Sequence, residues 1–314
     1  MTNSDKAINV SLLSEIFGYS RKKFSAHELY LHSLIKNLDK PFSDWGADLR
    51  EATGLPMIAI KEKYERIASI YKSDQTQYDL VSFWDEKYPN LLRRTDDAPF
   101  CLFYRGDISL LSRPAVAVVG TRNPTNEGVL RAEKLALVLT NNSFVVASGL
   151  AKGIDTAAHK SALKNNGKTV AVIGTPINRV YPKENEALQT EIAENGLIIS
   201  QFPLSVSVTP ANFPIRNYTM SGISAATIIV EAGETSGALI QAQQCLDQNN
   251  GRKLFILKNV LATDLRWPQK FKKLGATIID DDNLNEVIPP LKSLTNIEVK
   301  GSNNVPTSFS IKIE

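Results

Sequence analysis

One short stretch, ASGLAKGIDTAAHKSAL at residues 147–163, concentrates the residue types that could do chemistry. Gly149 and Gly153 flank Lys152 where an apolar run gives way to a helical pattern, which is typical of a turn that holds a phosphate. Asp155 and His159 follow four residues apart, a pairing that also occurs in hydrolytic sites. A tight strand-to-helix corner would use the same residues, so the stretch alone leaves three interpretations open.

The interpretation as a hydrolytic site fails because the necessary partner residues are missing from the sequence. No serine elbow or other nucleophile accompanies His159, and no second histidine lies nearby in the sequence to complete a metal site. We therefore interpret Asp155 as a helix-start residue and His159 as a packing or hydrogen-bonding residue. GTRNPTNEG departs from the dinucleotide fingerprint, and GETSGALI lacks the lysine of a Walker A loop. The sequence predicts no catalytic residue, no metal ligand and no cofactor.

The elements that must position this stretch come from the pattern after residue 114. Short runs rich in Val and Ile are apolar on successive residues, which is typical of strands buried on both faces of a parallel sheet. Helical patterns fill the gaps, so we expect an α/β fold with an extended Rossmann-like, doubly wound, mostly parallel sheet. An upstream stretch, PFCLFYRGD, predicts an additional edge strand. The apolar runs occupy residues 115–120, 144–149, 169–174, 196–202, 226–232, 253–257 and 276–280.

Changes in pattern divide the chain into three parts. Residues 1–75 contain helical-looking stretches and end near the polar break KSDQTQ, so they predict a small helical N-terminal domain. Residues 76–285 hold the predicted Rossmann-like domain. Residues 286–314 are rich in Pro, Asn and Ser and are expected to form a short C-terminal tail.

Composition narrows the class of protein. The chain has 314 residues, of which 43% are hydrophobic, and a formal net charge of +3. No apolar run approaches the roughly 18 residues that a membrane helix needs, and the start MTNSDKAINV lacks a secretory pattern. The two cysteines form no metal-ligand cluster, so we expect a cytoplasmic protein with no membrane partner. Because the net charge is small, any binding of nucleic acid must occur through a local basic patch.

Such a patch is predicted at the carboxyl ends of the strands, where open α/β sheets bind ligands. Glycines there allow close approach to the backbone, and exposed N–H groups at helix starts attract anions. Converging cationic side chains would complete a site for a polyphosphate or a phosphodiester. The basic residues of these loops are Arg122, Lys152, Arg179, Lys183 and Arg216.

Five segments taken together resemble the DNA-processing protein A family (DprA, also called Smf). They are KYPNLLRRTDDAPFCLFYRGD, VAVVGTRNPT, VVASGLAKGIDTAAHKSAL, TVAVIGTPINRVYPKEN and FPIRNYTMSGISAATIIVEAGETSGALIQAQQCLDQ. The resemblance implies a Rossmann-like protein that binds single-stranded DNA without a metal or nucleotide and works as a homodimer. It also implies roles in DNA processing, natural transformation and recombination, in which members protect single strands and help to load a RecA-type recombinase.

The resemblance also assigns a DNA-binding pocket to particular residues. We expect Lys152 to reach the phosphates of the DNA that this pocket holds. Tyr218, which stands where members commonly have a second Arg, is expected to stack on a base, an interaction worth ~1–3 kcal/mol. The residues that the family pattern carries over are Arg122, Ser148, Gly149, Gly153, Lys183, Arg216, Asn217, Ser236 and Gly237.

Two rival functions stay open at this point. Enzymes of the nucleotide phosphoribohydrolase type share a similar fold and carry a PGGxGTxxE loop, whereas EAGETSGALIQA lacks the Pro-Gly-Gly and the later Glu. Glu231 could still serve such an enzyme as acid or base. The other rival is a sensor that binds a free nucleotide without chemistry.

Overall fold

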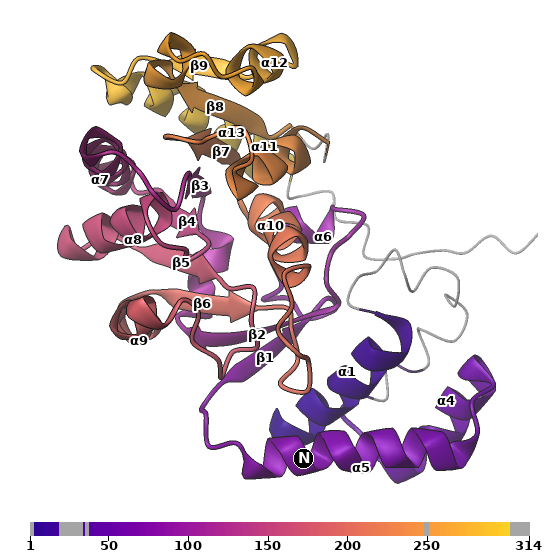
Figure 1. Cartoon of the computed structure of the whole chain (residues 1–314). Coiled ribbons are helices and arrows are strands. Elements are labelled where there is room, and N and C mark those ends of the chain that lie inside the picture. The colour runs from indigo at the N-terminus through magenta and orange to yellow at the C-terminus, as the bar shows by residue number, and fades with distance from the viewer. Residues whose placement is uncertain (1–2, 19–33, 35–37, 248–250, 302–314) are drawn as a thin grey trace, which may run out of the picture.

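A nine-stranded sheet forms the centre of the computed structural model, which describes residues 3–18, 34, 38–247 and 251–301 (Figure 1). The strand order is β1-β2-β6-β5-β4-β3-β7-β8-β9, and every pairing from β6 to β9 along this order is parallel. The seven predicted runs form β3 to β9, which confirms the fold class. The strands are β1 (Asp79–Ser82), β2 (Cys101–Gly106), β3 (Ala115–Val119), β4 (Val145–Ser148), β5 (Thr169–Val172), β6 (Leu197–Ser200), β7 (Ala226–Ile229), β8 (Lys253–Leu257) and β9 (Thr277–Ile279).

The predicted edge strand, β2, does not lie at the edge. It pairs antiparallel with β6 on one side and antiparallel with β1 on the other. β1 therefore forms this edge of the sheet. The short, mixed run DLVS that forms β1 carries too weak a pattern to stand out in the sequence.

Helices cover both faces of the sheet. Along β3, Val116 and Val118 face one cluster of buried side chains, and Ala117 and Val119 face another, because successive residues of a strand point to opposite faces. The first face is covered by α7, α8 and α13, and the second by α6, α10, α11 and α12. The helices of this part are α6 (Asn90–Arg93), α7 (Asn126–Asn141), α8 (Ile154–Lys164), α9 (Glu186–Asn195), α10 (Asn212–Ile223), α11 (Gly237–Asp247), α12 (Trp267–Lys273) and α13 (Ile288–Gly301).

The N-terminal region is helical, with α1 (Asn3–Phe17), α4 (Gly46–Thr53) and α5 (Met57–Ser73), and lies beside β1 and β2 (Figure 1). Its apolar side chains share one buried cluster with β2, β5, β6 and α9. The Tyr71 hydroxyl lies 2.6 Å from Ser11 Oγ and accepts a hydrogen bond of 3.2 Å from the backbone N–H of Leu204. These contacts fix the helices to the loop after β6.

Short 3₁₀ helices connect several of these elements. They are η2 (Phe42–Asp44), η3 (Ile108–Ser112), η4 (Lys183–Asn185), η5 (Lys258–Ala262) and η6 (Leu284–Val287).

The segment expected as a tail begins with a packed helix. Val287 at the end of η6, together with Ile288 and Leu291 at the start of α13, is buried in the cluster beneath α7. Apolar residues three or four apart give this segment one buried face despite its two prolines. Residues 302–314 lie outside the described part of the chain.

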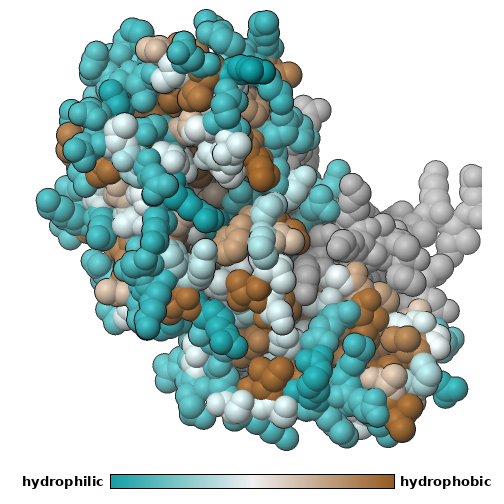
Figure 2. Space-filling model, in the orientation of Figure 1, coloured by the Kyte–Doolittle hydropathy of each residue, from teal (hydrophilic) through white to brown (hydrophobic). Residues whose placement is uncertain are grey.

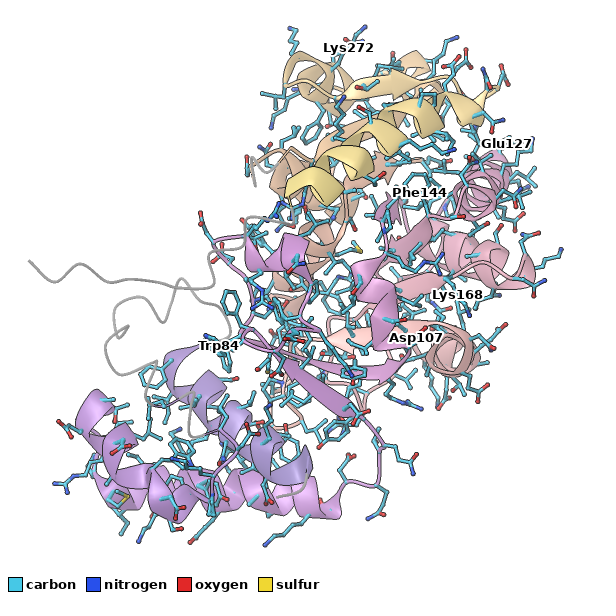
Figure 3. The ribbon with its side chains drawn as sticks, turned by 180° about the vertical axis from the view of Figure 1, so that it is seen from behind. Trp84, Asp107, Glu127, Phe144, Lys168 and Lys272 are labelled. Atoms are coloured by element: carbon cyan, nitrogen blue, oxygen red, sulfur yellow. The ribbon has the colours of Figure 1, made fainter. Side chains whose placement is uncertain are left out.

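The surface in Figure 2 is mostly hydrophilic, with apolar side chains in small groups. Figure 3 shows the molecule from behind, with Trp84 and Lys272 toward opposite ends of the sheet. Trp84 follows β1 and is 40% exposed, and Lys272 belongs to α12.

No helix among the described residues is both long and apolar enough to cross a bilayer.

Candidate functional site

Three basic loops meet at one edge of the sheet. β3, β4 and β5 run parallel, so the loops that follow them begin at the same edge. These loops carry Arg122, Lys152 and Lys183, and all three side chains are exposed. A Cβ on Gly153 would stand 2.9 Å from the Arg122 carbonyl carbon, so the first two loops are in direct contact. Arg179, in the third loop, is exposed as well.

The second and third loops are joined by an ion pair between Lys152 and Glu184. The hydrogen bond from Lys152 lowers the pKa of Glu184 below its ordinary value. Both side chains are more than half exposed, so this pair contributes little to stability. Lys183 is the neighbour of Glu184 and forms no ion pair with any residue that the structure describes. Its ammonium is therefore available to a ligand.

Arg216 of α10 lies beneath these loops and is only 6% exposed. Its Nη1 donates to the carbonyl oxygens of Gly149, at 2.6 Å, and Val172, and its Nε donates to Asn217 Oδ1 at 2.9 Å. Burial lowers the pKa of Arg216 to about 10, so the guanidinium stays charged at neutral pH. Within the described chain Nη2 makes no hydrogen bond, which leaves donors of a fixed cation for an anionic ligand.

Gly149 has a different role from the one expected. The sequence suggests that its missing side chain leaves room for a phosphate. A Cβ built on Gly149 would instead stand 2.4–2.5 Å from three atoms of the Arg216 guanidinium. The glycine makes room for a buried cation, and any contact with a phosphate at this point would come through Arg216. Gly153 is needed for its backbone, with φ at +78°.

The four other residues of the expected pocket each make structural hydrogen bonds or lie beside a residue that does. Asn217 and Gly237 belong to the Arg216 cluster, because Asn217 Nδ2 donates to the Gly237 carbonyl oxygen at 3.4 Å. Ser236 directly precedes α11, and its Oγ accepts from the Ala238 N–H. Ser148 is fully buried and donates to the Val118 carbonyl oxygen at 2.7 Å. Its hydroxyl therefore joins β4 to β3 and does not face the surface.

Asn185, which the sequence analysis does not single out, holds the glycine-containing loop. Leu150 has φ at +57°, a left-handed conformation that is uncommon outside glycine, and its side chain is fully buried. Asn185 Nδ2 donates to the Leu150 carbonyl oxygen and to Thr156 Oγ1, both at 2.9 Å. Because Asn185 follows Lys183 and Glu184, this clamp sets the position of Lys183 relative to Lys152.

An aromatic pair adjoins the basic loops. The Tyr181 and Phe213 ring centroids are 5.2 Å apart, with the planes at 47°. The Arg122 guanidinium carbon lies 5.9 Å from the Phe213 centroid, within the range of a cation–π contact. Tyr181 is 45% exposed. Neither residue was predicted from the sequence. Both stand close to predicted site residues, in YPK and NFPIRN, and this proximity could have identified them.

Tyr218 points away from this aromatic pair. Successive residues of a helix differ by about 100° in direction, so Tyr218 lies on nearly the opposite side of α10 from Arg216. It lines a separate pocket of about 470 Å³ together with side chains of α11 and α12. The structure therefore does not place the Tyr218 ring beside Arg122 and Lys183.

Asp155 and His159 have the structural roles that the sequence predicts. Asp155 Oδ2 accepts from the N–H groups of Gly149, at 3.1 Å, and Ala151, at 3.3 Å. His159 is fully buried with Nδ1 2.6 Å from Thr169 Oγ1, and burial lowers its pKa to about 3. Burial raises the pKa of Asp155. Among the described residues, no group of three or more His, Cys, Asp and Glu side chains is arranged to hold a metal ion.

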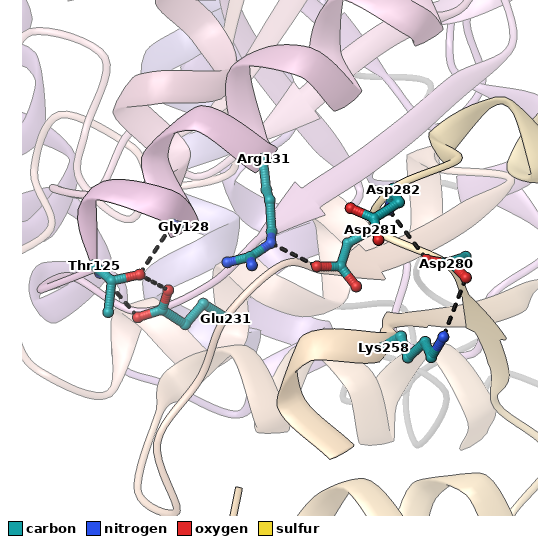
Figure 4. A network of polar contacts seen from close by, with 8 residues as sticks. All are labelled: Thr125, Gly128, Arg131, Glu231, Lys258, Asp280, Asp281 and Asp282. Carbon is teal, nitrogen blue, oxygen red and sulfur yellow. Dashed lines mark hydrogen bonds and ion pairs between the residues drawn. The ribbon is translucent and has the colours of Figure 1, made fainter. Parts of the chain in front are cut away.

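Glu231 is also engaged in structure (Figure 4). It follows β7, next to β3, where the strand order reverses and a doubly wound sheet normally opens a crevice. Its carboxylate accepts from the Thr125 N–H at 3.0 Å and from Thr125 Oγ1 at 2.7 Å. Thr125 Oγ1 in turn accepts from the Gly128 N–H and caps α7. The candidate acid or base of an enzyme is thus occupied by holding a helix start.

The fold and site define a Rossmann-like α/β protein with a cationic, aromatic-flanked edge where the loops after its central strands meet. Comparison with known proteins then identifies the family. The chain matches the model for DNA recombination-mediator protein A over residues 79–288 and belongs to this family.

Several relatives are similar over much of the chain. DNA processing protein DprA of Streptococcus pneumoniae is 39% identical over 212 residues, covering 67% of this chain and 74% of that protein. DprA of Bacillus subtilis is 34% identical over 200 residues, covering 63% and 66% of the two chains. The X-ray structure of the S. pneumoniae protein matches with a TM-score of 0.72 and 30% identity, covering 90% of this chain and 97% of that chain. The Helicobacter pylori DprA structure matches with a TM-score of 0.60 and 29% identity, covering 68% and 97%.

Proposed function

We propose that the chain binds single-stranded DNA along the edge formed by the loops after β3, β4 and β5, and acts in DNA processing and recombination without catalysing a reaction. Arg122, Lys152 and Lys183 contact successive phosphates from the surface. Arg216 reaches a phosphate through Nη2 from below. A short row of cations suits one flexible backbone better than the two phosphate lines of a duplex.

The observation that carries this proposal is the position of the Arg122 guanidinium over the Phe213 ring, with Tyr181 beside it. A cation beside an aromatic pair whose Tyr181 ring is exposed can hold a phosphate while the neighbouring base stacks on that ring. In a duplex the bases are already stacked on each other, so such a platform favours a single strand. Stacking tolerates any base, and sequence dependence should be weak.

The relatives support the same function. The H. pylori structure was reported for its unique single-stranded DNA binding mode, and the S. pneumoniae relative is a DNA processing protein. The enzyme alternative loses support because Glu231 is occupied by the start of α7. The sensor alternative predicts a site for one nucleotide, whereas the basic residues here extend along three loops.

Titration of labelled single-stranded and blunt duplex oligonucleotides of equal length, at one salt concentration, tests the proposal. We expect clearly tighter binding to the single strand and little difference between oligo-dT and mixed sequences. Equal or tighter binding to the duplex would contradict it. Incubation with nucleoside monophosphates should release no free base, and release would revive the enzyme alternative.

We also propose the finer properties that family membership implies, namely a cytoplasmic homodimer that protects incoming strands during natural transformation and helps to load a RecA-type recombinase. Light scattering after gel filtration would give the mass of the particle. Strand-exchange assays with and without the protein would test loading. A monomer, or no change in recombinase assembly, would contradict the corresponding part.

A further inference from the structure

The end of α5 holds both loops that present the aromatic pair of the proposed site. Tyr181 belongs to the loop after β5, and Phe213 is the second residue of α10, which follows the loop after β6. Their ring centroids are 5.2 Å apart, so the pair forms only when both loops are held in place. The function proposed so far gives the N-terminal helices no part in the site.

Asp74, the residue directly after α5, anchors the first of these loops. Its Oδ2 accepts a hydrogen bond of 2.5 Å from Asn178 Nδ2, although 104 residues separate the two in the chain. Its Oδ1 accepts from the Thr76 N–H at 2.8 Å, which fixes the carboxylate on the side of the N-terminal region. Asp74 and Asn178 are both half-buried, so water and salt screen this charge-assisted hydrogen bond only in part. The carboxylate therefore ties the loop after β5 to α5.

The segment next to Asn178 is itself held by hydrogen bonds, and this transmits the restraint to Tyr181. The carbonyl oxygen of Arg179 accepts from Gln189 Nε2 at 3.1 Å and from Thr175 Oγ1 at 3.3 Å. Arg179 is two residues before Tyr181 in the sequence. A shift of Asn178 would therefore move the start of the segment that carries the ring.

Tyr71, in the last turn of α5, anchors the second loop. Its hydroxyl accepts from the Leu204 N–H at 3.2 Å and lies 2.6 Å from Ser11 Oγ. Leu204 is buried in the cluster that the N-terminal helices share with the sheet, so the loop after β6 starts from a fixed point. At the other end of this loop, the Phe213 N–H donates to the Pro210 carbonyl oxygen at 3.3 Å.

Other contacts hold the cations of the site. Lys183 is fixed by its neighbour Asn185, whose Nδ2 donates to the Leu150 carbonyl oxygen at 2.9 Å. Arg122 and Lys152 belong to the loops after β3 and β4. A change at the end of α5 should therefore move the rings and leave the phosphate contacts in place.

We propose that the end of α5 sets the spacing of the Tyr181–Phe213 pair for stacking with a base of the bound strand. Asp74 and Tyr71 are the positioning residues, because each holds one of the two loops. The inference rests on the proposed function, since the base comes from the bound single strand. It makes the N-terminal helical region part of the DNA-binding site, acting through the rings rather than by contact with the strand.

The test measures the affinity of the full chain for oligothymidylate and for an abasic oligomer with the same number of phosphates. Asn178→Ala should lose about 5-fold or more on oligothymidylate, the lower end of the cost of one stacking contact, and nothing on the abasic strand. Tyr71→Phe removes only the hydroxyl and should show the same split, including when Asn178→Ala does not fold. Asn195→Ala, at the exposed end of α9, should bind both strands as the wild type does.

An exchange of the two side chains separates positioning from a general loss of structure. Asn178→Asp alone places two carboxylates against each other and should weaken binding to oligothymidylate. Adding Asp74→Asn restores the hydrogen bond with its direction reversed, so the affinity should return to that of the wild type. A doubly substituted chain that binds as weakly as Asn178→Asp would overturn the pairing.

Other outcomes are distinct from this one. Equal loss on both strands, or no loss on either, would overturn the role of α5 while leaving the proposed function intact. Hydrogen exchange without DNA tests the anchor by itself: the Arg179 N–H, which donates to the Pro176 carbonyl oxygen at 3.0 Å, should exchange faster in Asn178→Ala. Failure of the wild type to bind any single strand would overturn the proposed function, and unchanged exchange would overturn the anchor.

Discussion

The guanidinium of Arg216 occupies the space that the missing side chain of Gly149 leaves, and its Nη1 donates to the Gly149 carbonyl oxygen at 2.6 Å. This contact joins the loop after β4 to α10, although 67 residues separate the two in the chain. A buried arginine held by carbonyl oxygens is a preformed cation, because it loses no side-chain freedom when an anion arrives.

Gly149→Ala should therefore displace Arg216. We expect the free energy of unfolding to fall by about 1–3 kcal/mol through overpacking, and affinity for single strands to fall about tenfold or more. Denaturant unfolding and strand titration would measure the two effects. Gly233→Ala is the matched control, since a Cβ there meets no atom within 4 Å. Wild-type binding by folded Gly149→Ala would show that Arg216 does not contact the ligand.

Arg122→Ala and Lys183→Ala should each weaken binding about equally for all sequences, because phosphate contacts carry no sequence information. Each change should also reduce the slope of log affinity against log salt by roughly one. Titrations at several salt concentrations would give the slopes. Lys160→Ala, an exposed lysine on α8 outside the loops, should change neither quantity. A folded double variant with normal binding would remove this edge as the site.

Asn185→Ala should lower the free energy of unfolding by about 1–3 kcal/mol, because it leaves the Leu150 carbonyl oxygen without its side-chain donor and frees a loop with a strained residue. Strand affinity should fall as well, since Lys183 adjoins the clamp. Asn195→Ala, at the exposed end of α9, should cost only a few tenths of a kcal/mol. Equal effects of the two substitutions would argue against a clamp.

His159 should make stability depend on pH. Its folded pKa of about 3 lies below the ordinary value of 6.5, so between these values the unfolded chain binds more protons at this site. The free energy of unfolding should therefore fall as pH is lowered, by up to about 1.4 kcal/mol per pH unit. Asp155, whose pKa burial raises, contributes with the opposite sign as pH falls toward its ordinary value of 3.8.

Comparison with His159→Gln separates the two contributions. Unfolding measured between about pH 6 and pH 4 should show a shallower fall in stability for the variant than for the wild type. Parallel pH profiles would mean that His159 is protonated in the folded protein or reached by water.

The sheet and the class of site could both be predicted from patterns in the sequence. Strands β3 to β7 were predictable because a strand buried on both faces must be apolar along its whole length, a local property, and β8 and β9 carry most of the same pattern. The basic residues after β3, β4 and β5 were predictable as one edge because parallel strands end together. The five segments that resemble the family identified single-stranded DNA as the expected ligand. Charge and spacing alone could not distinguish it from any other phosphate ligand.

The way in which the predicted residues separate into different sites depends on the packing of the whole fold. Arg216, Asn217 and Tyr218 are consecutive in the sequence, yet helical geometry turns Arg216 to Gly149 and Tyr218 to a pocket on the far side of α10. Glu231 holds the residue that caps α7, because packing brings it to Thr125. Phe213 and Tyr181 became a pair for the same reason. Such contacts join residues distant in sequence, and their geometry depends on how the helices and strands pack, which no local pattern records.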